Sequence, residues 1–358
     1  MTDENATLPP LRDIQVIAPN FKRRHSGVTS TVIRLVPEQA RSIPIVACAP
    51  DLPPQVPNMA PSRLLTLPAR SDGAPRVWHA RRNVEMIAGI ALRTLARKKL
   101  RLLFTSAAQR RHKPFTRWLI RQMDAVIATS QKSADYLERD ATVIHHGIDC
   151  EAFSPVQDRA ALRQSLDLPP DGPLVGCFGR IRHQKGNDLF VRAMIRVFSD
   201  IPQGRALVMG RATEEHQAFL QGLKDEVAAA GLSDRILFRD EVPIAQLSRH
   251  FQALDLYVAP QRWEGFGLTP LEAMGCGSPV VATRVGAFEA LVVPGETGYL
   301  TDIEDLDGIT RHVRDLLEDD AKRAAFGAAA RERATGSFSI QAEAQAIIAV
   351  YKKLLGEA

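Results

Sequence analysis

The sequence is poor in cysteine and aromatic residues and has no long apolar run. Its four cysteines are far apart, and none forms a Cys-x-x-Cys pair, which argues against a zinc ribbon and favours a reduced compartment. The apolar stretch at residues 86–96 is shorter than the ~20 residues that cross a bilayer. Residues 1–7 are polar and acidic, unlike a signal peptide. We therefore expect a cytoplasmic protein without a membrane span.

Length and charge both divide the chain in two. At 358 residues it exceeds the size at which a single core stops growing, so two domains are expected. Residues 1–150 hold 23 Lys and Arg against 12 Asp and Glu, so this half predicts an anionic partner. The aromatic-interleaved and zinc-finger patterns of nucleic-acid binders are absent from the sequence. Anionic lipid, or an acceptor with phosphates and carboxylates, explains the charge as well.

A short segment at residues 261–279 joins two carboxylates, several glycines and a helix start. Apolar runs on both sides predict buried strands. Thr269 is expected to cap a short helix that ends at Gly275, because threonine favours the N-cap and glycine the C-terminal stop. Glu272 then lies inside this helix.

The glycines before this helix predict an anion site. Gly265 and Gly267 have no Cβ, so a ligand can approach the backbone N–H groups at the helix start. Glu264 would be repelled by a phosphate, and we expect it to accept hydrogen bonds from neutral hydroxyls such as those of a sugar. The alternative is that Glu264 is a solvated loop residue and Glu272 a carboxylate favoured by the helix dipole.

A second segment repeats the arrangement of strand, loop and helix. The predicted strand at residues 174–178 is followed by Gly179 and by a loop with Arg180 and Lys185, and then by an amphipathic helix at residues 187–198. An arginine fork and a lysine point charge together suit a diphosphate. The alternative is a pair of solvated loop cations.

The two segments together resemble the donor-site signature of the retaining glycosyltransferases of family 4, which have the GT-B fold. The matching residues are Phe178-Gly-Arg…Lys-Gly186 and Glu264-Gly-Phe-Gly-Leu…Glu272. Further stretches are similar to the lipopolysaccharide core mannosyltransferases of alphaproteobacteria, at residues 16–24, 26–30, 78–83 and 104–110.

The resemblance implies an α/β fold of two facing Rossmann-like domains with the active site in the cleft between them. We expect an N-terminal acceptor-binding domain at residues 1–160 and a C-terminal nucleotide-sugar-binding domain at residues 161–338. The helix at residues 339–358 should return to the first domain.

The implied reaction transfers mannose from GDP-mannose, with retention, to the Kdo-lipid A inner core, by a peripheral enzyme on the inner face of the inner membrane. Arg180 and Lys185 would neutralise the leaving diphosphate, Glu264 would hold the sugar and Glu272 the ribose. No Asp-x-Asp motif lies near these residues, so we expect no metal and no cofactor. The donor site is expected to comprise Gly27, Gly179, Arg180, Lys185, Glu264, Gly265, Phe266, Gly267, Leu268, Thr269 and Glu272.

The sequence departs from the family pattern in its first half. The family often has two glycines where this chain has Ser26 and Gly27, and a His-x-His where it has His79 and Arg81. A histidine common in relatives is replaced by Ala107. We expect His112 to be a solvated loop residue, and acceptor binding to involve His79, Arg81 and Arg82.

Two alternatives remain open. The enzyme could use a UDP-sugar donor or another anionic lipid acceptor, or the chain could be a non-catalytic sugar-nucleotide sensor or an RNA-binding protein. The basic residues predict a membrane and acceptor dock formed by Lys22, Arg23, Arg24, Arg81, Arg97, Lys98 and Lys99.

Overall fold

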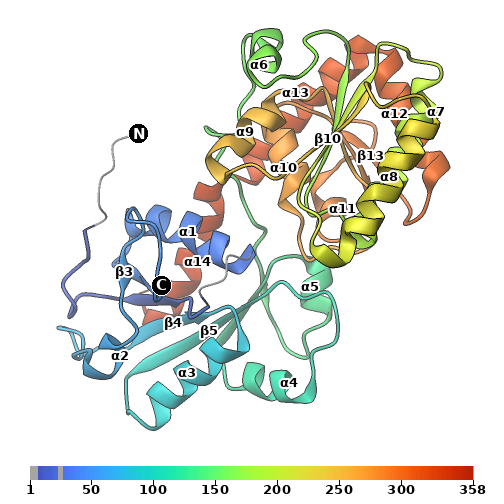
Figure 1. The fold of residues 1–358 in the computed structure, drawn as a ribbon. Helices are drawn as coiled ribbons and strands as arrows, with labels where there is room; N and C mark the ends of the chain where they lie inside the picture. Colours follow the sequence, from blue (N-terminus) through green and yellow to red (C-terminus); the bar gives the residue numbers. More distant parts are fainter. Residues whose placement is uncertain (1–6, 23–26, 358) are drawn as a thin grey trace. The chain divides into compact units, whose positions relative to one another are not determined.

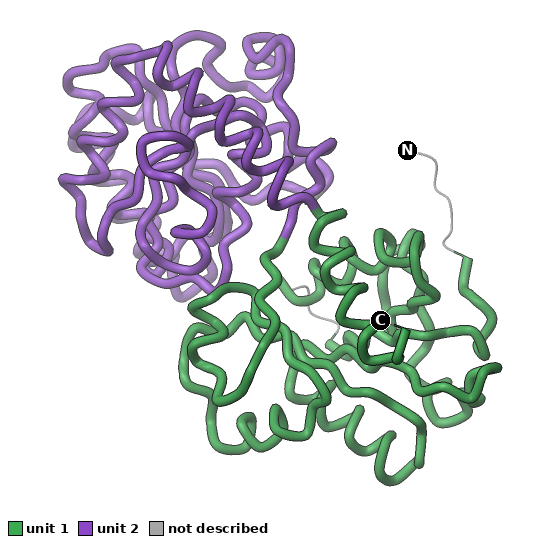
Figure 2. The backbone as a smooth tube through the Cα atoms, turned by 180° about the vertical axis from the view of Figure 1, so that it is seen from behind, with its two compact units in different colours: residues 1–146, 340–358 green, residues 147–339 purple. Residues whose placement is uncertain are grey.

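The chain forms two compact units. The computed structural model describes residues 7–22 and 27–357. Unit 1 comprises Met1–His146 and Ile340–Ala358, and unit 2 comprises Gly147–Ser339 (Figure 2). The chain therefore leaves unit 1, completes unit 2 and returns.

Unit 1 is built on a seven-stranded parallel sheet in the order β3-β2-β1-β4-β5-β6-β7. Its inner strands are short apolar runs buried on both faces, as parallel strands require. The short edge strand β3 lies in a proline-rich connection at residues 51–61. The strands are β1 (Val16–Pro19), β2 (Ile45–Cys48), β3 (Asn58–Met59), β4 (Arg76–Ala80), β5 (Leu100–Ser106), β6 (Ala125–Ala128) and β7 (Thr142–Val143).

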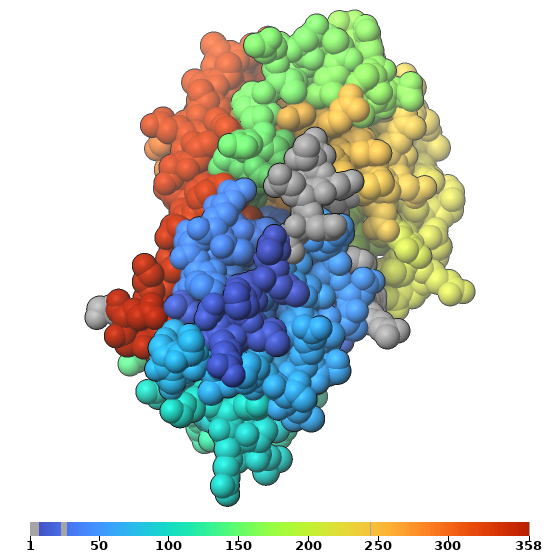
Figure 3. All heavy atoms as spheres, turned by 90° about the vertical axis from the view of Figure 1, so that its left-hand side faces the viewer, coloured from blue at the N-terminus to red at the C-terminus, as the bar shows by residue number. Residues whose placement is uncertain are grey.

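Helices cover both faces of this sheet (Figure 1). Buried residues of α2 (Arg63–Thr66), α3 (Asn83–Thr94) and α4 (Pro114–Arg121) share one core cluster with the strands. Those of α1 (Gly27–Ala40) and the last helix α14 (Ile340–Leu355) share another. The red C-terminal segment accordingly lies against blue N-terminal segments in the space-filling view (Figure 3). The short helix α5 (Gln131–Asp135) follows β6.

Unit 2 repeats the plan with six parallel strands in the order β10-β9-β8-β11-β12-β13. The strands are β8 (Leu174–Phe178), β9 (Arg205–Met209), β10 (Ile236–Arg239), β11 (Leu256–Ala259), β12 (Val280–Thr283) and β13 (Gly298–Thr301). The helices are α6 (Arg159–Ser165), α7 (Asn187–Phe198), α8 (Gln217–Ala229), α9 (Ile244–Gln252), α10 (Leu268–Gly275), α11 (Phe288–Leu291), α12 (Leu306–Glu318) and α13 (Asp320–Ser337), with 3-10 turns η1 (His183–Lys185) and η2 (Glu214–His216).

Residues 147–160, which we assigned to the first domain, belong to unit 2. Phe153 packs edge-on against Phe251, with ring centroids 5.8 Å apart. Arg331 of α13 donates hydrogen bonds to the carbonyl oxygens of Phe153 and Cys150. These contacts with distant residues fix the segment to unit 2, and a composition shift along the chain does not reveal them.

Each sheet reverses its strand order at one point, between β1 and β4 in unit 1 and between β8 and β11 in unit 2. Loops that leave the carboxyl ends of two strands on either side of such a point diverge and leave a crevice in which ligands bind. The loop before Gly27 follows β1, and Arg81 and Arg82 follow β4. The two donor-site segments of the sequence analysis follow β8 and β11.

Candidate functional site

The loop after β8 is held by close contact with the loop after β11. Gly179 has φ 131° and Gly186 has φ 70°, conformations that other residues rarely adopt. A Cβ at Gly186 would lie 2.0 Å from the carbonyl oxygen of Pro260, the residue after β11. Glycine at position 186 is therefore required by the fold, and it brings η1 and the start of α7 against the second loop.

Helix α10 begins earlier than we predicted. Gly267, with φ 89°, precedes its first residue Leu268, so Thr269 lies inside the helix and is not the N-cap. The left-handed conformation at Gly267 ends the loop abruptly, and the helix needs no side-chain cap. The first N–H groups of α10 remain at the carboxyl end of β11, as an anion site requires.

Lys185 and Glu264 meet at this point. The Lys185 ammonium forms an ion pair with the Glu264 carboxylate, and their side chains are 20% and 18% exposed. The other Glu264 oxygen accepts a hydrogen bond of 3.0 Å from the Gly265 N–H. Residues 79 positions apart in sequence thus form one partly buried cluster.

The remaining predicted donor residues differ in exposure. Arg180 is exposed and forms no ion pair with any residue that the structure describes. Glu272 is 8% exposed within α10. The Phe266 ring lies in the core, so only its backbone can face a ligand. Leu268 is half-buried, and its side chain packs on the same core cluster.

Sequence reasoning missed the residue that clamps the two loops together. Arg262 donates two hydrogen bonds to Asp188 at the start of α7, 2.7 and 2.9 Å long, and others to Glu304 and to the His183 carbonyl. Burial opposes the charge of Asp188, but hydrogen bonds and Coulomb attraction from Arg262 lower its pKa. The same partners raise the pKa of Arg262 against the effect of burial. Arg262 therefore positions η1 and Lys185.

Two further positioning residues were also missed. The fully buried Tyr257 donates a hydrogen bond to the Phe178 carbonyl and accepts one from the Phe178 N–H, both 3.1 Å long. Burial raises the pKa of Tyr257 well above its usual value, so this hydroxyl stays protonated. Gly286, with φ 60°, lets its backbone approach the Glu264 loop, where a Cβ would lie 2.6 Å from the Phe266 carbonyl oxygen.

The predicted site residues at the start of unit 1 lie at its own switch point. Gly27 is exposed at the first position of α1, and a Cβ there would meet no atom within 4 Å, so the fold itself does not require glycine. Ser26 lies outside the described residues. Arg82 donates hydrogen bonds to Asn20 and Thr29 and forms an ion pair with the buried Glu85. These contacts tie β1, α1 and α3 together.

The structure contradicts the expectation that His79 contacts an acceptor. His79 is fully buried on the central strand β4, with Nδ1 2.6 Å from the Tyr351 hydroxyl and Nε2 2.7 Å from the Thr105 hydroxyl. Burial, followed by the Arg81 charge, lowers the pKa of His79 well below its usual value. Arg81 is 9% exposed and forms no ion pair with a carboxylate of the described chain.

His112 is not the solvated residue that we expected. It is half-buried, and its Nε2 lies 3.3 Å from the Ser106 hydroxyl at the end of β5. Burial and then the charge of Arg110 lower the pKa of His112. The loop does fold back toward the strand, at the carboxyl edge of the sheet.

The predicted basic dock does not form a single face. Lys22 and Arg81 follow the carboxyl ends of strands, whereas residues 97–99 precede β5 at the opposite edge of the same sheet. Arg23 and Arg24 lie outside the described residues. Helix α3 lies between Arg81 and residues 97–99 in the chain and carries it from one edge of the sheet to the other, which separates the two groups.

Within residues 7–22 and 27–357 no cluster of His, Cys, Asp and Glu could hold a metal ion. Among these residues no helix is long and apolar enough to cross a bilayer.

Comparison with known proteins identifies the fold and the family. A family model described as glycosyl transferases group 1 matches residues 158–333. The chain is 52% identical over 349 residues to the lipopolysaccharide core biosynthesis mannosyltransferase LpsB of Rhizobium meliloti, covering 96% of this chain and 99% of that one. It is 51% identical over 354 residues to the mannosyltransferase of the same description, LpcC, of Rhizobium leguminosarum, covering 98% and 99%. The crystal structure of Anabaena Alr3699/HepE in complex with UDP superposes with a TM-score of 0.80 at 21% identity, covering 95% of this chain and all of that one.

Two doubly wound parallel sheets with this structural likeness define a GT-B glycosyltransferase fold. The chain belongs to the group 1 glycosyltransferases, in the family that includes LpsB and LpcC. It is therefore a glycosyltransferase, and the expectation from the paired motifs is confirmed.

Proposed function

We propose that this enzyme transfers mannose from GDP-mannose, with retention of configuration, to the Kdo-lipid A inner core of lipopolysaccharide. The observation that carries this proposal is the cluster of Lys185 and Glu264 at the β8/β11 switch point. The descriptions of the two rhizobial relatives, similar over nearly their whole length, support mannose and the lipopolysaccharide core.

In the proposed mechanism the donor diphosphate lies on Arg180, Lys185 and the first N–H groups of α10. Arg180 is exposed and free of a carboxylate partner in the described chain, so it can bind phosphate oxygens without breaking an ion pair. Lys185 would exchange Glu264 for the diphosphate. Both cations then stabilise the charge that develops as the glycosidic bond breaks.

Glu264, which pairs with Lys185 in this structure, has a second role when the donor is bound. Once Lys185 turns to the diphosphate, the Glu264 carboxylate is free to accept hydrogen bonds from the hydroxyls of the transferred sugar, while Glu272 holds the ribose. With retention and no covalent intermediate, the departing phosphate takes the proton of the acceptor hydroxyl, so Ala107 in place of a histidine is compatible with activity. Gly27 is the first residue of α1 and has no side chain. A phosphate could therefore approach the N–H groups at the start of this helix closely.

We propose that the enzyme works at the inner face of the inner membrane, where a lipid-linked acceptor resides. A transfer assay with radiolabelled GDP-mannose, UDP-glucose and UDP-N-acetylglucosamine on Kdo-lipid A tests the proposal, with product configuration read by NMR. Transfer from GDP-mannose alone, giving an α-linked product, is expected. Transfer only from a UDP-sugar, or inversion, would contradict the donor or the mechanism.

A further inference from the structure

The outer face of the α2–α3–α4 layer carries an unusual number of exposed apolar side chains. Val84 and Ile87 of α3, and Leu95 directly after its last residue, project to solvent with the spacing of one side of a helix. In α4 the exposed rings of Phe115 and Trp118 stack with centroids 6.0 Å apart. The set, with exposed fractions, is Leu65 71%, Val84 43%, Ile87 44%, Leu95 83%, Phe115 55% and Trp118 49%.

This outward stripe is separate from the side of α3 that builds the core. Met86 and Leu92 are buried against the sheet, and a Cβ at Gly89 would lie 2.5 Å from the Trp78 ring. Helix α3 is therefore tightly docked on the sheet by one side, and it still presents an apolar stripe on the other. Exposed apolar side chains that gather on one face of a protein, as they do on α2, α3 and α4, are typical of an interaction site.

The same layer is strongly cationic. Residues 83–122 contain ten Lys and Arg and one carboxylate, Glu85, which is fully buried. Asp124 and Glu138 form ion pairs with some of these cations. Six others form no ion pair with a residue in the described part of the chain: Arg97, Lys98, Lys99, Arg110, Arg111 and Lys113.

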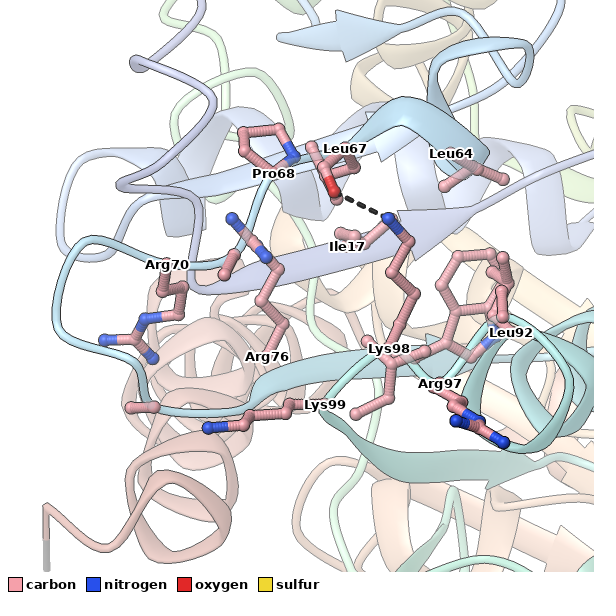
Figure 4. Close-up of a pocket in the computed structure, with 15 residues that line it drawn as sticks. Ile17, Leu64, Leu67, Pro68, Arg70, Arg76, Leu92, Arg97, Lys98 and Lys99 are labelled. Carbon is pink, nitrogen blue, oxygen red and sulfur yellow. Dashed lines mark hydrogen bonds between the residues drawn. The ribbon is translucent and has the colours of Figure 1, made fainter.

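A cavity of about 280 Å³ lies at the C-terminal end of α3, beside the amino ends of β4 and β5 (Figure 4). Its wall holds five cations and no carboxylate. Arg76, 5% exposed, donates hydrogen bonds only to the carbonyl oxygens of Ile14 and Leu11, and Lys98 donates one to the Leu67 carbonyl. The apolar part of the wall comprises Leu64, Leu67, Trp78, Leu92 and Leu100.

Such a cavity suits a ligand that is anionic at one end and apolar at the other. Arg70 is already paired with Asp72, but Arg76, Arg97, Lys98 and Lys99 have no carboxylate partner among the described residues, so an entering anion is favoured. Burial, and then the charge of Arg70, lowers the pKa of Arg76, against a smaller opposite effect of Asp72. The leucines of the wall match an alkyl chain, and the exposed Leu65 and Leu95 are adjacent in sequence to residues that line the cavity.

We propose that the outer face of α2, α3 and α4 lies on an anionic phospholipid bilayer, with the phosphate of one lipid in the cavity beside α3. Trp118 and the leucines enter the headgroup region, where amphipathic aromatic side chains are favoured, and Arg97, Lys98 and Lys99 meet lipid phosphates. A nucleic acid would satisfy the cations but leave the apolar stripe in water. This surface rests on the proposed function in one respect, since it names what holds the enzyme on the membrane that contains the acceptor.

Vesicle sedimentation tests the surface. The full-length protein is mixed with vesicles of phosphatidylcholine alone or of phosphatidylcholine with phosphatidylglycerol, at low and physiological salt. Binding to the anionic vesicles alone, weaker at higher salt, is expected. Arg97→Gln with Lys99→Gln should weaken binding about twenty-fivefold, at roughly fivefold for each cation. Ile87→Ser with Leu95→Ser should also weaken it.

Matched controls lie in unit 2. Lys224→Gln removes an exposed lysine and Ile303→Ser an exposed isoleucine, 47% exposed, and both should bind as the parent does. Equal binding to neutral and anionic vesicles, or normal binding by both surface variants, overturns the proposal.

Calorimetry with water-soluble dihexanoyl phosphatidylglycerol, dihexanoyl phosphatidylcholine and inorganic phosphate tests the cavity. Only the first should bind, and Lys99→Gln should weaken it. Inorganic phosphate binding as tightly would make the cavity a small-anion site and overturn its assignment to lipid. Transfer of mannose to a water-soluble core fragment should be normal in all surface variants. This readout separates failure of the membrane surface from failure of the proposed transferase reaction.

Discussion

Replacing Lys185 by alanine should abolish most of the transferase rate with little loss of stability. The Lys185 side chain is 20% exposed and its ion pair with Glu264 is partly buried, so the pair contributes about 1 kcal/mol to folding, the upper end of the range for exposed pairs. For a unit of the size of unit 2 (Gly147–Ser339), that corresponds to a fall of roughly 2–4 °C in the unfolding midpoint. Loss of a charged contact made in the transition state costs about 10²- to 10³-fold in kcat.

The assay compares initial rates of sugar transfer with unfolding midpoints from calorimetry. Lys224→Ala, at an exposed lysine of α8, is the control and should change neither. The double variant Lys185→Ala, Glu264→Gln removes the unpaired carboxylate as well and should remain slow, because the phosphate contact is still missing. Recovery of the rate in the double variant would show that Lys185 acts only by neutralising Glu264, and a near-normal rate in Lys185→Ala would refute the donor site.

Three further predictions follow from contacts in the structure. Gly186→Ala should lower both the unfolding midpoint and nucleotide affinity more than Gly231→Ala, because both have φ near 70° but only the first new Cβ would clash; calorimetry of both variants checks this. Asp188→Asn should cost stability at neutral pH. The lowered pKa of Asp188 means that its carboxylate stabilises the fold above the unfolded pKa of ~3.9 and loses this effect as the pH falls through the folded value, so the difference from the parent in urea unfolding should shrink at pH ~3. Arg81→Ala should raise the acceptor KM and leave GDP-mannose affinity unchanged, whereas His79→Ala, which leaves buried hydroxyls unpaired, should lower the unfolding midpoint with normal KM; the reverse pattern would place the acceptor at His79.

Local sequence patterns were enough to predict most of the fold. Short apolar runs identified β8, β11 and β12, and amphipathic spacing identified α7. The positions of Lys185 and Glu264 after two such strands predicted that both belong to one site. The ion pair between them agrees with this, because adjacent parallel strands bring their carboxyl-end loops together.

What sequence reasoning missed depends on contacts between distant residues. We expected His79 to contact an acceptor. In the structure His79 is buried against Tyr351, 272 positions later, and the sequence around His79 does not reveal that neighbour. In the sequence, Arg262 cannot be distinguished from other loop arginines. Its role depends on Asp188 and Glu304, which are distant in the chain and accept its hydrogen bonds. Tyr257 belongs to a run of apolar residues whose spacing predicts a strand. The spacing does not predict that the Tyr257 hydroxyl forms hydrogen bonds with the backbone of Phe178.

The position of α14 in unit 1 has a consequence for synthesis on the ribosome. The helix supplies Ile340, Ile347, Ile348 and Tyr351 to the core on one face of the first sheet. The ribosome must first make Gly147–Ser339, which takes roughly 10–40 s at about 5–20 residues per second. During that interval unit 1 cannot close this face of its sheet, so the nascent chain exposes an apolar surface that chaperones can bind, and the half made first is the last to finish folding.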